Sequence, residues 1–356
     1  MRRDSLFAEL GSRWIVDQGP DADVVITSRV RLARNLRGYP FPHLMQETDA
    51  KRMLQEVDDL VVLGSQHGDV GRLRLVRMAD LDRLDREVLV EKHLISRDLA
   101  RSRHAGAAML VRDDEAISIM INEEDHLRIQ CLLSGLQLEE CYRMASRCDD
   151  WLEGRFEYAF DQTHGYLTAC PTNVGTGLRA SVMVHLPGLV MTQQIGNMLA
   201  AISKVGLVVR GLYGEGTESS GDVFQISNQI TLGPSEEEIL QNLGAVIRQL
   251  IEQERASRQA VLKAARVVLE DRVYRSYGVL TNARLLTSQE SMRLLSDVKL
   301  GADLELIDVP STRAFSQLLV MSQPAMVQRL ADQQLGEAER DQKRAELVRE
   351  RLQAKD

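Results

Sequence analysis

The stretch CPTNVGTGLRASVMVHLPG, residues 170–188, combines a cysteine, an asparagine, spaced glycines and an arginine ahead of an apolar run. Pro171 restricts the backbone beside the thiol of Cys170, and Gly175 and Gly177 permit a tight turn. The thiol could serve as a nucleophile, a metal ligand, a redox group or a buried apolar side chain. Cysteine chemistry alone leaves these four alternatives open.

Two acidic stretches carry carboxylates that could hold a cation and accept a proton from it. NEEDH, residues 122–126, follows an alternating apolar run and includes Glu124. YGEGTE, residues 213–218, carries Glu215 and Glu218 beside glycines that permit a ligand to approach the backbone closely. A solvated turn explains the first stretch equally simply when it is taken by itself.

Five arginines lie in or next to predicted strands. Arg29 and Arg31 are two residues apart, so their side chains point to one face of a strand. Arg128, Arg179 and Arg210 lie at or near the ends of other predicted strands. The planar guanidinium donates paired hydrogen bonds to phosphate oxygens, so convergence of these residues would create a phosphate site. Scattered surface arginines are the alternative on spacing alone.

Short strands followed by long helices must position these side chains. β-Branched residues cluster and alternate over residues 24–31, which predicts the strand that carries the first two arginines. Further strands are expected over residues 72–78, 106–111, 116–122, 180–188, 206–216 and 222–233, and helices over residues 47–63 and 188–202.

From residue 235 onward the pattern becomes helical. Ser235 and Glu238 form a capping box, and apolar residues between 239 and 251 recur at helical spacing. We therefore predict an α+β protein. It would have a lead-in over residues 1–20, an α+β domain over residues 21–255 with a largely antiparallel sheet flanked by helices, and a small all-helical domain over residues 256–356.

Composition narrows the function classes. The net charge of −8 argues against a dedicated binder of nucleic acid or anionic membranes. No apolar run approaches the ~20 residues of a membrane span, and the N-terminal residues lack the apolar core of a signal peptide. The cysteines form no CxxC pair and show no zinc-ligand spacing with the histidines, so we expect no protein-bound structural metal. The four are Cys131, Cys141, Cys148 and Cys170.

Four ordered motifs resemble those of the guanidino (phosphagen) kinases, the ATP:guanido phosphotransferase family. They are TSRVRLARN, INEEDHLRIQ, CPTNVGTGLRASV and RG…GEGTES…ISN, between residues 23 and 229. Small-molecule kinases of this family have a helical domain before the catalytic domain. Here the motifs begin at residue 27 and a helical region follows instead. This arrangement, with VEKHLIS and the tail motif RDQKRA, resembles the bacterial protein-arginine kinases of the McsB type over essentially the whole chain.

The resemblance implies a phosphagen-kinase-like catalytic domain and a nucleotide site. The five arginines would clamp the phosphates of ATP, and Mg²⁺ would bridge ATP oxygens without protein side-chain ligands. His93 would lie against the nucleotide. The implied ATP-binding residues are Thr27, Ser28, Arg29, Val30, Arg31, His93, Arg128, Arg179, Ala180, Ser181, Val182, Met183, Arg210, Gly211, Leu212, Tyr213, Gly214 and Glu215.

The same resemblance implies catalytic roles at the acceptor end. Glu124 would hold the acceptor guanidinium, assisted by Asn173 and by Cys170 as a thiolate, which nearby positive charge favours. Aligning the RG dipeptide makes Glu215 the second carboxylate, whereas an ungapped alignment on ISN makes it Glu218. We favour Glu215, because the RG alignment keeps a phosphate-binding arginine in place.

The tail motif resembles a phosphoarginine pocket. Arg340 and Arg344 are four apart and share a helix face, while Asp341 would bind a guanidinium. A solvated charged face is the simpler interpretation without the family. The implied pocket comprises Arg340, Asp341, Gln342, Lys343, Arg344 and Ala345.

The resemblance also implies partners and a bacterial cytoplasmic location. Substrates would be proteins with exposed arginines, the enzyme a homodimer, and its product a tag for a Clp-type unfoldase and protease. A zinc-binding activator protein and a heat-shock repressor are further implied partners.

Three alternative functions remain. The nearest is a kinase for a small guanidino compound such as free arginine. The second is an adaptor that binds phosphoarginine proteins and presents them to a protease. The third is a cysteine-dependent guanidine hydrolase, which the phosphate-binding arginines disfavour.

Overall fold

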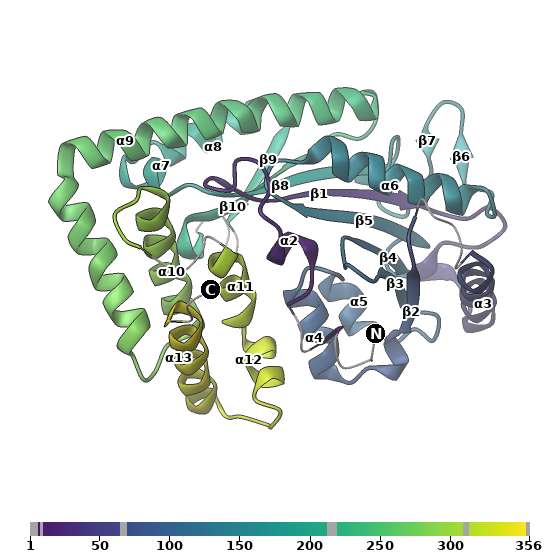
Figure 1. The fold of residues 1–356 in the computed structure, drawn as a ribbon. Coiled ribbons are helices and arrows are strands. Elements are labelled where there is room, and N and C mark those ends of the chain that lie inside the picture. The colour runs from purple at the N-terminus through teal and green to yellow at the C-terminus, as the bar shows by residue number, and fades with distance from the viewer. Residues whose placement is uncertain (1–5, 8–9, 65–69, 212–218, 309–312, 354–356) are drawn as a thin grey trace.

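A computed structural model describes residues 6–7, 10–64, 70–211, 219–308 and 313–353. Its centre is an eight-stranded antiparallel sheet with the order β2-β3-β4-β5-β1-β8-β10-β9 (Figure 1). The predicted α+β class is therefore confirmed. The strands are β1 Val25–Arg34, β2 Leu73–Arg77, β3 Ala108–Arg112, β4 Ile117–Ile121, β5 Leu127–Ser134, β8 Leu178–His185, β9 Leu207–Gly211 and β10 Val223–Asn228. A separate two-stranded hairpin joins β6 Phe160–Asp161 to β7 Gly165–Tyr166.

The upper face of the sheet in Figure 1 is apolar and covered by helices. Val30, Leu32, Ala180, Val182 and their neighbours point to this face and are buried. They pack against amphipathic helices, because an apolar stripe along each helix matches the apolar sheet face. These helices are α3 Glu47–Gly64, α6 Leu138–Glu153 and the first half of α9 Glu236–Asn282, with the shorter α7 Pro187–Met191 and α8 Ile195–Lys204 nearby.

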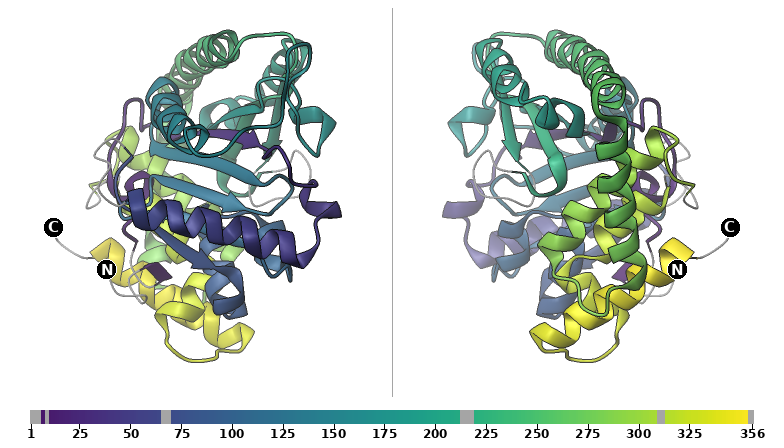
Figure 2. Two further views of the ribbon diagram at one scale, coloured as in Figure 1. Left: turned by 90° about the vertical axis from the view of Figure 1, so that its right-hand side faces the viewer. Right: turned by 90° about the vertical axis from the view of Figure 1, so that its left-hand side faces the viewer.

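The C-terminal helices fold back to the other side of the sheet. Helix α9 starts at the predicted capping box of Ser235 and Glu238 and bends at Ala265, whose backbone is not helical. Figures 1 and 2 show α9 above the sheet and the last helices below it. These helices are α10 Ser288–Asp303, α11 Arg313–Met321, α12 Pro324–Leu330 and α13 Glu337–Gln353.

Between the C-terminal helices and the lower face lie three short helices, α2 Arg13–Val16, α4 Arg83–Glu91 and α5 Arg97–Arg101. Helix α12 packs beside α4. Leu6, Phe7, Trp14 and Ile15 of the N-terminal lead-in are buried in this second core. Residues at both ends of the chain therefore help to cover the lower face of the sheet.

One helix differs from the sequence-based expectation. The helix expected over residues 188–202 is two helices, α7 and α8, because Gln193 adopts a positive φ of 57° between them. The division expected at residue 255 falls inside the continuous first half of α9. Among the helices of the described residues, none has the length and apolar composition needed to cross a bilayer.

Candidate active site

The five candidate arginines project from one face of the sheet. In antiparallel strands, directly opposed residues point to the same side. Arg31 is opposite Arg179 on β8, and Arg29 is opposite Ser181. Arg128 is opposite Ala33, one pleat further along β1, and Arg210 is opposite Gln225 on β10. The strand register therefore places all five arginine side chains on the lower face of the sheet. A phosphate site requires these side chains to lie close together on one face.

These five arginines, called the arginine cluster below, are not neutralised by an equal number of nearby carboxylates. Burial, with repulsion from Arg128 and Arg179, lowers the pKa of Arg29 to about 10. The pKa of Arg31 is lowered well below its usual value by burial and by repulsion from Arg29, Arg128 and Arg179, whereas Glu123 raises it. The Nε atoms of Arg31 and Arg179 are buried and have no hydrogen-bond partner among the described residues. Buried donors without partners are costly, so this face is suited to an anionic ligand that supplies oxygen acceptors.

Polar neighbours hold part of the cluster in place. Arg29 donates from Nε to Ser181 Oγ at 3.2 Å and from NH2 to Gln225 Oε1 at 2.9 Å. The ring of His93 lies beside Arg29, and burial together with that positive charge lowers the pKa of His93 to about 3. A neutral imidazole is thus kept next to the cluster. Its ring contacts the buried Trp14 ring in a tilted arrangement, with a centroid distance of 5.4 Å and an interplanar angle of 53°.

The acidic turn after β4 adjoins this cluster. Arg128 binds Glu123 at 2.7 Å and Glu124 at 3.0 Å. The two carboxylates have different surroundings, because the side chain of Glu123 is 3% exposed and that of Glu124 is 41% exposed. Glu123 also accepts from the Ser96 hydroxyl at 2.7 Å. Glu123 is therefore held within the protein, and the Glu124 carboxylate is the more accessible of the two.

The loop before β8 brings Cys170 to the same end of the sheet. Cys170 is half-buried and precedes the 3-10 helix η3 Pro171–Asn173, in which Asn173 is buried. Its sulfur lies 3.0 Å from the Thr172 hydroxyl. Gly175 and Gly177 have φ values of 109° and 63°, and a Cβ at either position would clash with neighbouring backbone. The predicted tight turn is confirmed.

Electrostatics place Arg179 between the two ends of the site. Burial and repulsion from Arg210 and Arg128 lower its pKa, whereas Cys170 and Glu124 act in the opposite direction. The Arg179 guanidinium therefore interacts electrostatically with other arginines of the cluster and also with Glu124 and Cys170. A phosphoryl group bound at the cluster would face an acceptor held at that pair.

Asp125 is a site residue that the sequence-based assignment missed. It is fully buried, and its Oδ1 accepts from Asn35 Nδ2 and from the backbone N–H of Ala169, both at 2.7 Å. This carboxylate thereby fixes the loop of Cys170 to the turn of Glu124. The only sequence signal was its place in NEED, because its partners are 90 and 44 residues away.

The predicted ATP-binding set includes residues from both faces of the sheet. Thr27 and Met183 share the arginine face, but the side chains of Ser28, Val30, Ala180 and Val182 point to the opposite, helix-covered face. Ser28, for example, donates to Gly135 O at 2.8 Å. Alternation of side chains along a strand makes this unavoidable, so these four could offer only main-chain groups. Gly211 ends β9, and Leu212, Tyr213, Gly214, Glu215 and Glu218 lie outside the described residues.

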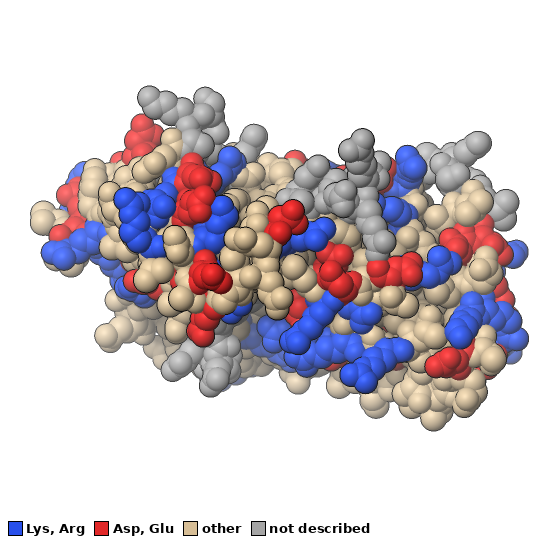
Figure 3. All heavy atoms as spheres, turned by 90° about the horizontal axis from the view of Figure 1, so that it is seen from below, with Lys and Arg blue, Asp and Glu red and all other residues tan. Residues whose placement is uncertain are grey.

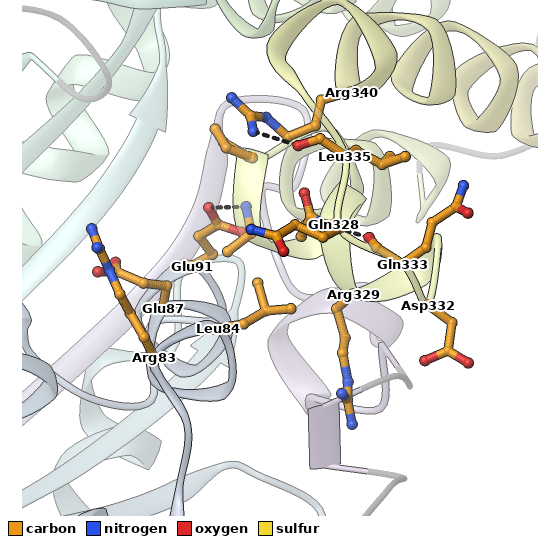
Figure 4. Close-up of a pocket in the computed structure, with 13 residues that line it drawn as sticks. Arg83, Leu84, Glu87, Glu91, Gln328, Arg329, Asp332, Gln333, Leu335 and Arg340 are labelled. Atoms are coloured by element: carbon orange, nitrogen blue, oxygen red, sulfur yellow. Dashed lines mark hydrogen bonds between the residues drawn. The ribbon is translucent and has the colours of Figure 1, made fainter.

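The tail motif lies at the start of α13, beside a pocket of about 800 Å³ between α4 and α12. Figure 4 shows Arg340 on one side of this pocket and Arg83 and Glu91 of α4 on another. Arg340 donates to Leu335 O at 3.1 Å.

Arg340 and Arg344 both lie on α13, four residues apart as predicted, and Arg344 is the more deeply buried of the two. Arg344 is 2% exposed, donates to the carbonyls of Ser322 and Leu286 at 2.6 and 2.7 Å, and binds Asp341. Its guanidinium points inward, because main-chain carbonyls at the ends of neighbouring helices need donors. Lys343 pairs with Glu346, Gln342 is exposed, and Ala345 is buried.

On the face seen from below, the described residues form no single extended basic patch. Figure 3 shows acidic and basic side chains interspersed there, with one compact group of basic ones near the middle. Among the described residues there is no group of three or more His, Cys, Asp or Glu side chains that could hold a metal ion.

Comparison with known proteins agrees with this geometry. The family model described as ATP:guanido phosphotransferase, C-terminal catalytic domain, matches residues 52–257, and the protein-arginine kinase McsB C-terminal domain matches residues 266–356. The protein-arginine kinase of Moorella thermoacetica is 54% identical over 98% of this chain and 99% of its own. That of Halalkalibacterium halodurans is 51% identical over 100% of this chain and 99% of its own. A lombricine kinase crystal structure has a TM-score of 0.58 at 26% identity, covering 68% of each chain.

Proposed function

The chain belongs to the ATP:guanido phosphotransferase family, and from this premise we propose that it is a protein-arginine kinase. The γ-phosphoryl group of ATP would move to a guanidino nitrogen of an arginine side chain in a protein, leaving ADP and a phosphoarginine residue. The observation that carries this proposal is the crowded arginine face of the sheet, with Glu124 and Cys170 at its end.

The arginine cluster binds the phosphates of ATP. Arg29, Arg31, Arg128, Arg179 and Arg210 replace their mutual repulsion by charge-assisted hydrogen bonds to phosphate oxygens. The same groups neutralise the charge on the transferring phosphoryl group, which is where enzymes of this chemical class supply most of their catalysis. Mg²⁺ held by the phosphate oxygens would add positive charge there.

Glu124 and Cys170 lie where the acceptor arginine would bind, and there the enzyme must make a protonated guanidinium nucleophilic. A guanidinium has a pKa above ~12, so it arrives protonated and is a poor nucleophile. Glu124 holds it through two parallel hydrogen bonds and accepts the proton that leaves the attacking nitrogen. Glu215 is our choice for the second carboxylate, with Glu218 as the alternative. Cys170 and Asn173 orient the guanidinium, and Asp125 fixes the loop that carries Cys170.

The C-terminal region would bind the phosphoarginine product. We place the division between the two regions at residue 255 within α9, which the two adjoining family models support. Phosphoarginine would bind at Arg340 and Asp341, with its guanidinium displacing that of Arg344 from Asp341. Binding there, in a homodimer, would regulate the kinase.

Partners and location follow from the family resemblance. The enzyme would act in the bacterial cytoplasm on proteins with exposed arginines. Its product would mark them for a Clp-type unfoldase and protease, a heat-shock repressor would be one substrate, and a zinc-binding protein would activate it. Co-purification with each candidate partner tests these assignments.

The decisive experiment is phosphoryl transfer to a protein. Purified enzyme is incubated with Mg-ATP and an arginine-containing protein such as casein, and mass spectrometry at neutral pH, which preserves the P–N bond, locates the phosphate. We expect phosphoarginine from the native enzyme and its loss in Glu124→Ala and Cys170→Ala. A matched control is Glu157→Ala, an exposed carboxylate that pairs with Arg37 and is not assigned to the site.

The alternatives predict different products. Transfer only to free arginine would identify a small-molecule guanidino kinase. Binding of phosphoarginine proteins without any ATP turnover, also in the presence of an activator, would identify an adaptor and refute the proposal.

A further inference from the structure

A second pocket, of about 300 Å³, opens next to Glu124. Besides Glu123 and Glu124 it is lined by His43, Ser102, His104 and Asn122. None of these last four has a role in binding the phosphates or the guanidinium. His43 lies in the 3-10 helix η1 Pro42–Leu44, Ser102 and His104 lie just after α5, and Asn122 directly follows β4.

This pocket contains polar atoms whose hydrogen bonds are not satisfied within the protein. Among the described residues, neither ring nitrogen of His104 has a partner, although both atoms are buried. The side chain of Asn122 is also buried, in a residue that is 3% exposed, and its Oδ1 has no partner. A buried polar atom left unpaired costs roughly 1–3 kcal/mol, so three of them on two residues that line one pocket point to a ligand with donors and acceptors.

Hydrogen bonds fix the side chain of Asn122 and the backbone of His104. Asn122 has a positive φ of 53°, and its Nδ2 donates to Gly106 O at 3.0 Å. The backbone N–H of His104 donates to Ser102 Oγ at 3.2 Å, and its carbonyl accepts from Ala107 at 3.0 Å. A preorganised pocket loses little conformational entropy on binding.

The chemistry of the unpaired atoms matches a peptide group. A neutral histidine ring offers one N–H donor and one acceptor, and the Asn122 oxygen is an acceptor. A peptide unit offers one N–H donor and one carbonyl acceptor. An arginine whose guanidinium is bound at Glu124 carries its peptide groups only one side chain away, and Glu124 itself lines this pocket.

We infer that this pocket binds the main chain of a protein substrate beside the acceptor arginine. His104 donates to a substrate carbonyl, and Asn122 accepts a substrate N–H. The inference rests on the proposed function, and it assigns to these two residues the preference for arginine within a polypeptide.

The test compares two acceptors that share the guanidino group. N-acetyl-arginine N-methylamide has peptide groups on both sides of its α-carbon, whereas butylguanidine has none. We expect His104→Ala to lower kcat/KM for the diamide about tenfold and to leave butylguanidine unchanged. His104→Gln, which keeps a donor and an acceptor, should restore part of the loss. His164→Ala on the exposed β6–β7 hairpin is the matched control and should change neither acceptor.

Equal effects of His104→Ala on both acceptors, or no effect on either, would overturn the inference while leaving the kinase activity established. Without transfer to any acceptor the proposed function fails, and a binding measurement then decides the inference separately. Fluorescence anisotropy of a labelled Gly-Arg-Gly peptide supports it if His104→Ala weakens binding about tenfold, and contradicts it if the affinity is unchanged.

Discussion

Arg31, a proposed phosphate-binding residue, lies in surroundings that work against the stability of the fold. Arg31 is half-buried beside the guanidinium groups of Arg29, Arg128 and Arg179, and its buried Nε has no partner among the described residues. Such an unfavourable arrangement of charges is retained where ligand binding offsets its cost in folding stability. Perturbed electrostatics therefore mark candidate functional sites. The same holds for Arg179 at the next strand.

Replacing Arg31 by methionine should therefore separate stability from binding. We expect Arg31→Met to raise the free energy of unfolding of the ligand-free protein by about 1–3 kcal/mol, because an unpaired buried charge is removed. ADP should bind at least tenfold more weakly, a loss of about 1.4 kcal/mol. Thermal unfolding with and without nucleotide measures both effects.

Arg37→Met is the control for that experiment, because Arg37 is 72% exposed just beyond the same strand. It should alter neither quantity. A destabilised Arg31→Met protein that still gains its full thermal shift from ADP would contradict the electrostatic argument.

At the scale of elements, Glu254 of α9 joins helices from both parts of the chain. Its carboxylate accepts from the backbone N–H groups of Gly188 and Leu189 in α7, at 2.8 and 2.9 Å, and from Arg258 at 2.6 Å. Arg258 in turn binds Asp303 of α10 at 3.1 Å. All three ionic groups are almost completely buried. The network fixes the angle at which α9 crosses the sheet, and with it the position of the helices that follow.

Glu254→Ala should consequently lower the free energy of unfolding by roughly 3–5 kcal/mol, since it leaves Arg258 buried without one of its carboxylates. Urea unfolding provides the measurement. Glu252→Ala, an exposed position one half-turn earlier on the same helix, should cost less than 0.5 kcal/mol or so. A small loss for Glu254→Ala would show that packing alone holds α9 in place.

For the molecule as a whole, Glu91 links the first and last thirds of the chain. Both of its oxygens accept backbone N–H groups at the start of α12, from Ala325 at 2.8 Å and Met326 at 2.7 Å. Burial raises the pKa of Glu91 to about 7; the two N–H groups and Arg344 lower it, and Glu87 raises it. The residue lies two positions before His93, so this link adjoins the proposed nucleotide site.

This link makes stability depend on pH with a definite sign. A carboxyl whose pKa is higher in the folded state binds more protons folded than unfolded, between about pH 4.5 and 7. Stability should therefore fall as the pH rises through this window, by up to about 3 kcal/mol. We expect the Tm of the native protein to drop between pH 5 and 8 and the drop to shrink in Glu91→Gln. The control Glu252→Gln should keep the native pH profile, and a Glu91→Gln profile identical to it would refute the assignment.

Much of this protein follows from local pattern. Alternation over residues 24–31 and the capping box of Ser235 and Glu238 predict elements that the structure contains, because side-chain spacing and cap chemistry depend on neighbours in sequence. The ordered motifs likewise identify the family and its chemistry. The positions of Glu124 and Cys170 at one end of the sheet are consistent with that expectation.

The features that only the tertiary structure decided depend on contacts between residues far apart in the sequence. The strand register determines which residues of SRVR and RASV face the arginine cluster and which face the core. Asp125, Glu91 and His104 acquire their roles from groups brought to them by folding, and Arg344 turns inward to satisfy carbonyls of distant helices. Sequence by itself determined which elements form and which chemistry they carry, since those depend on local geometry and residue type. Burial, charge crowding and unpaired polar atoms are properties of three-dimensional packing, so the working site and its energetic cost were decided there.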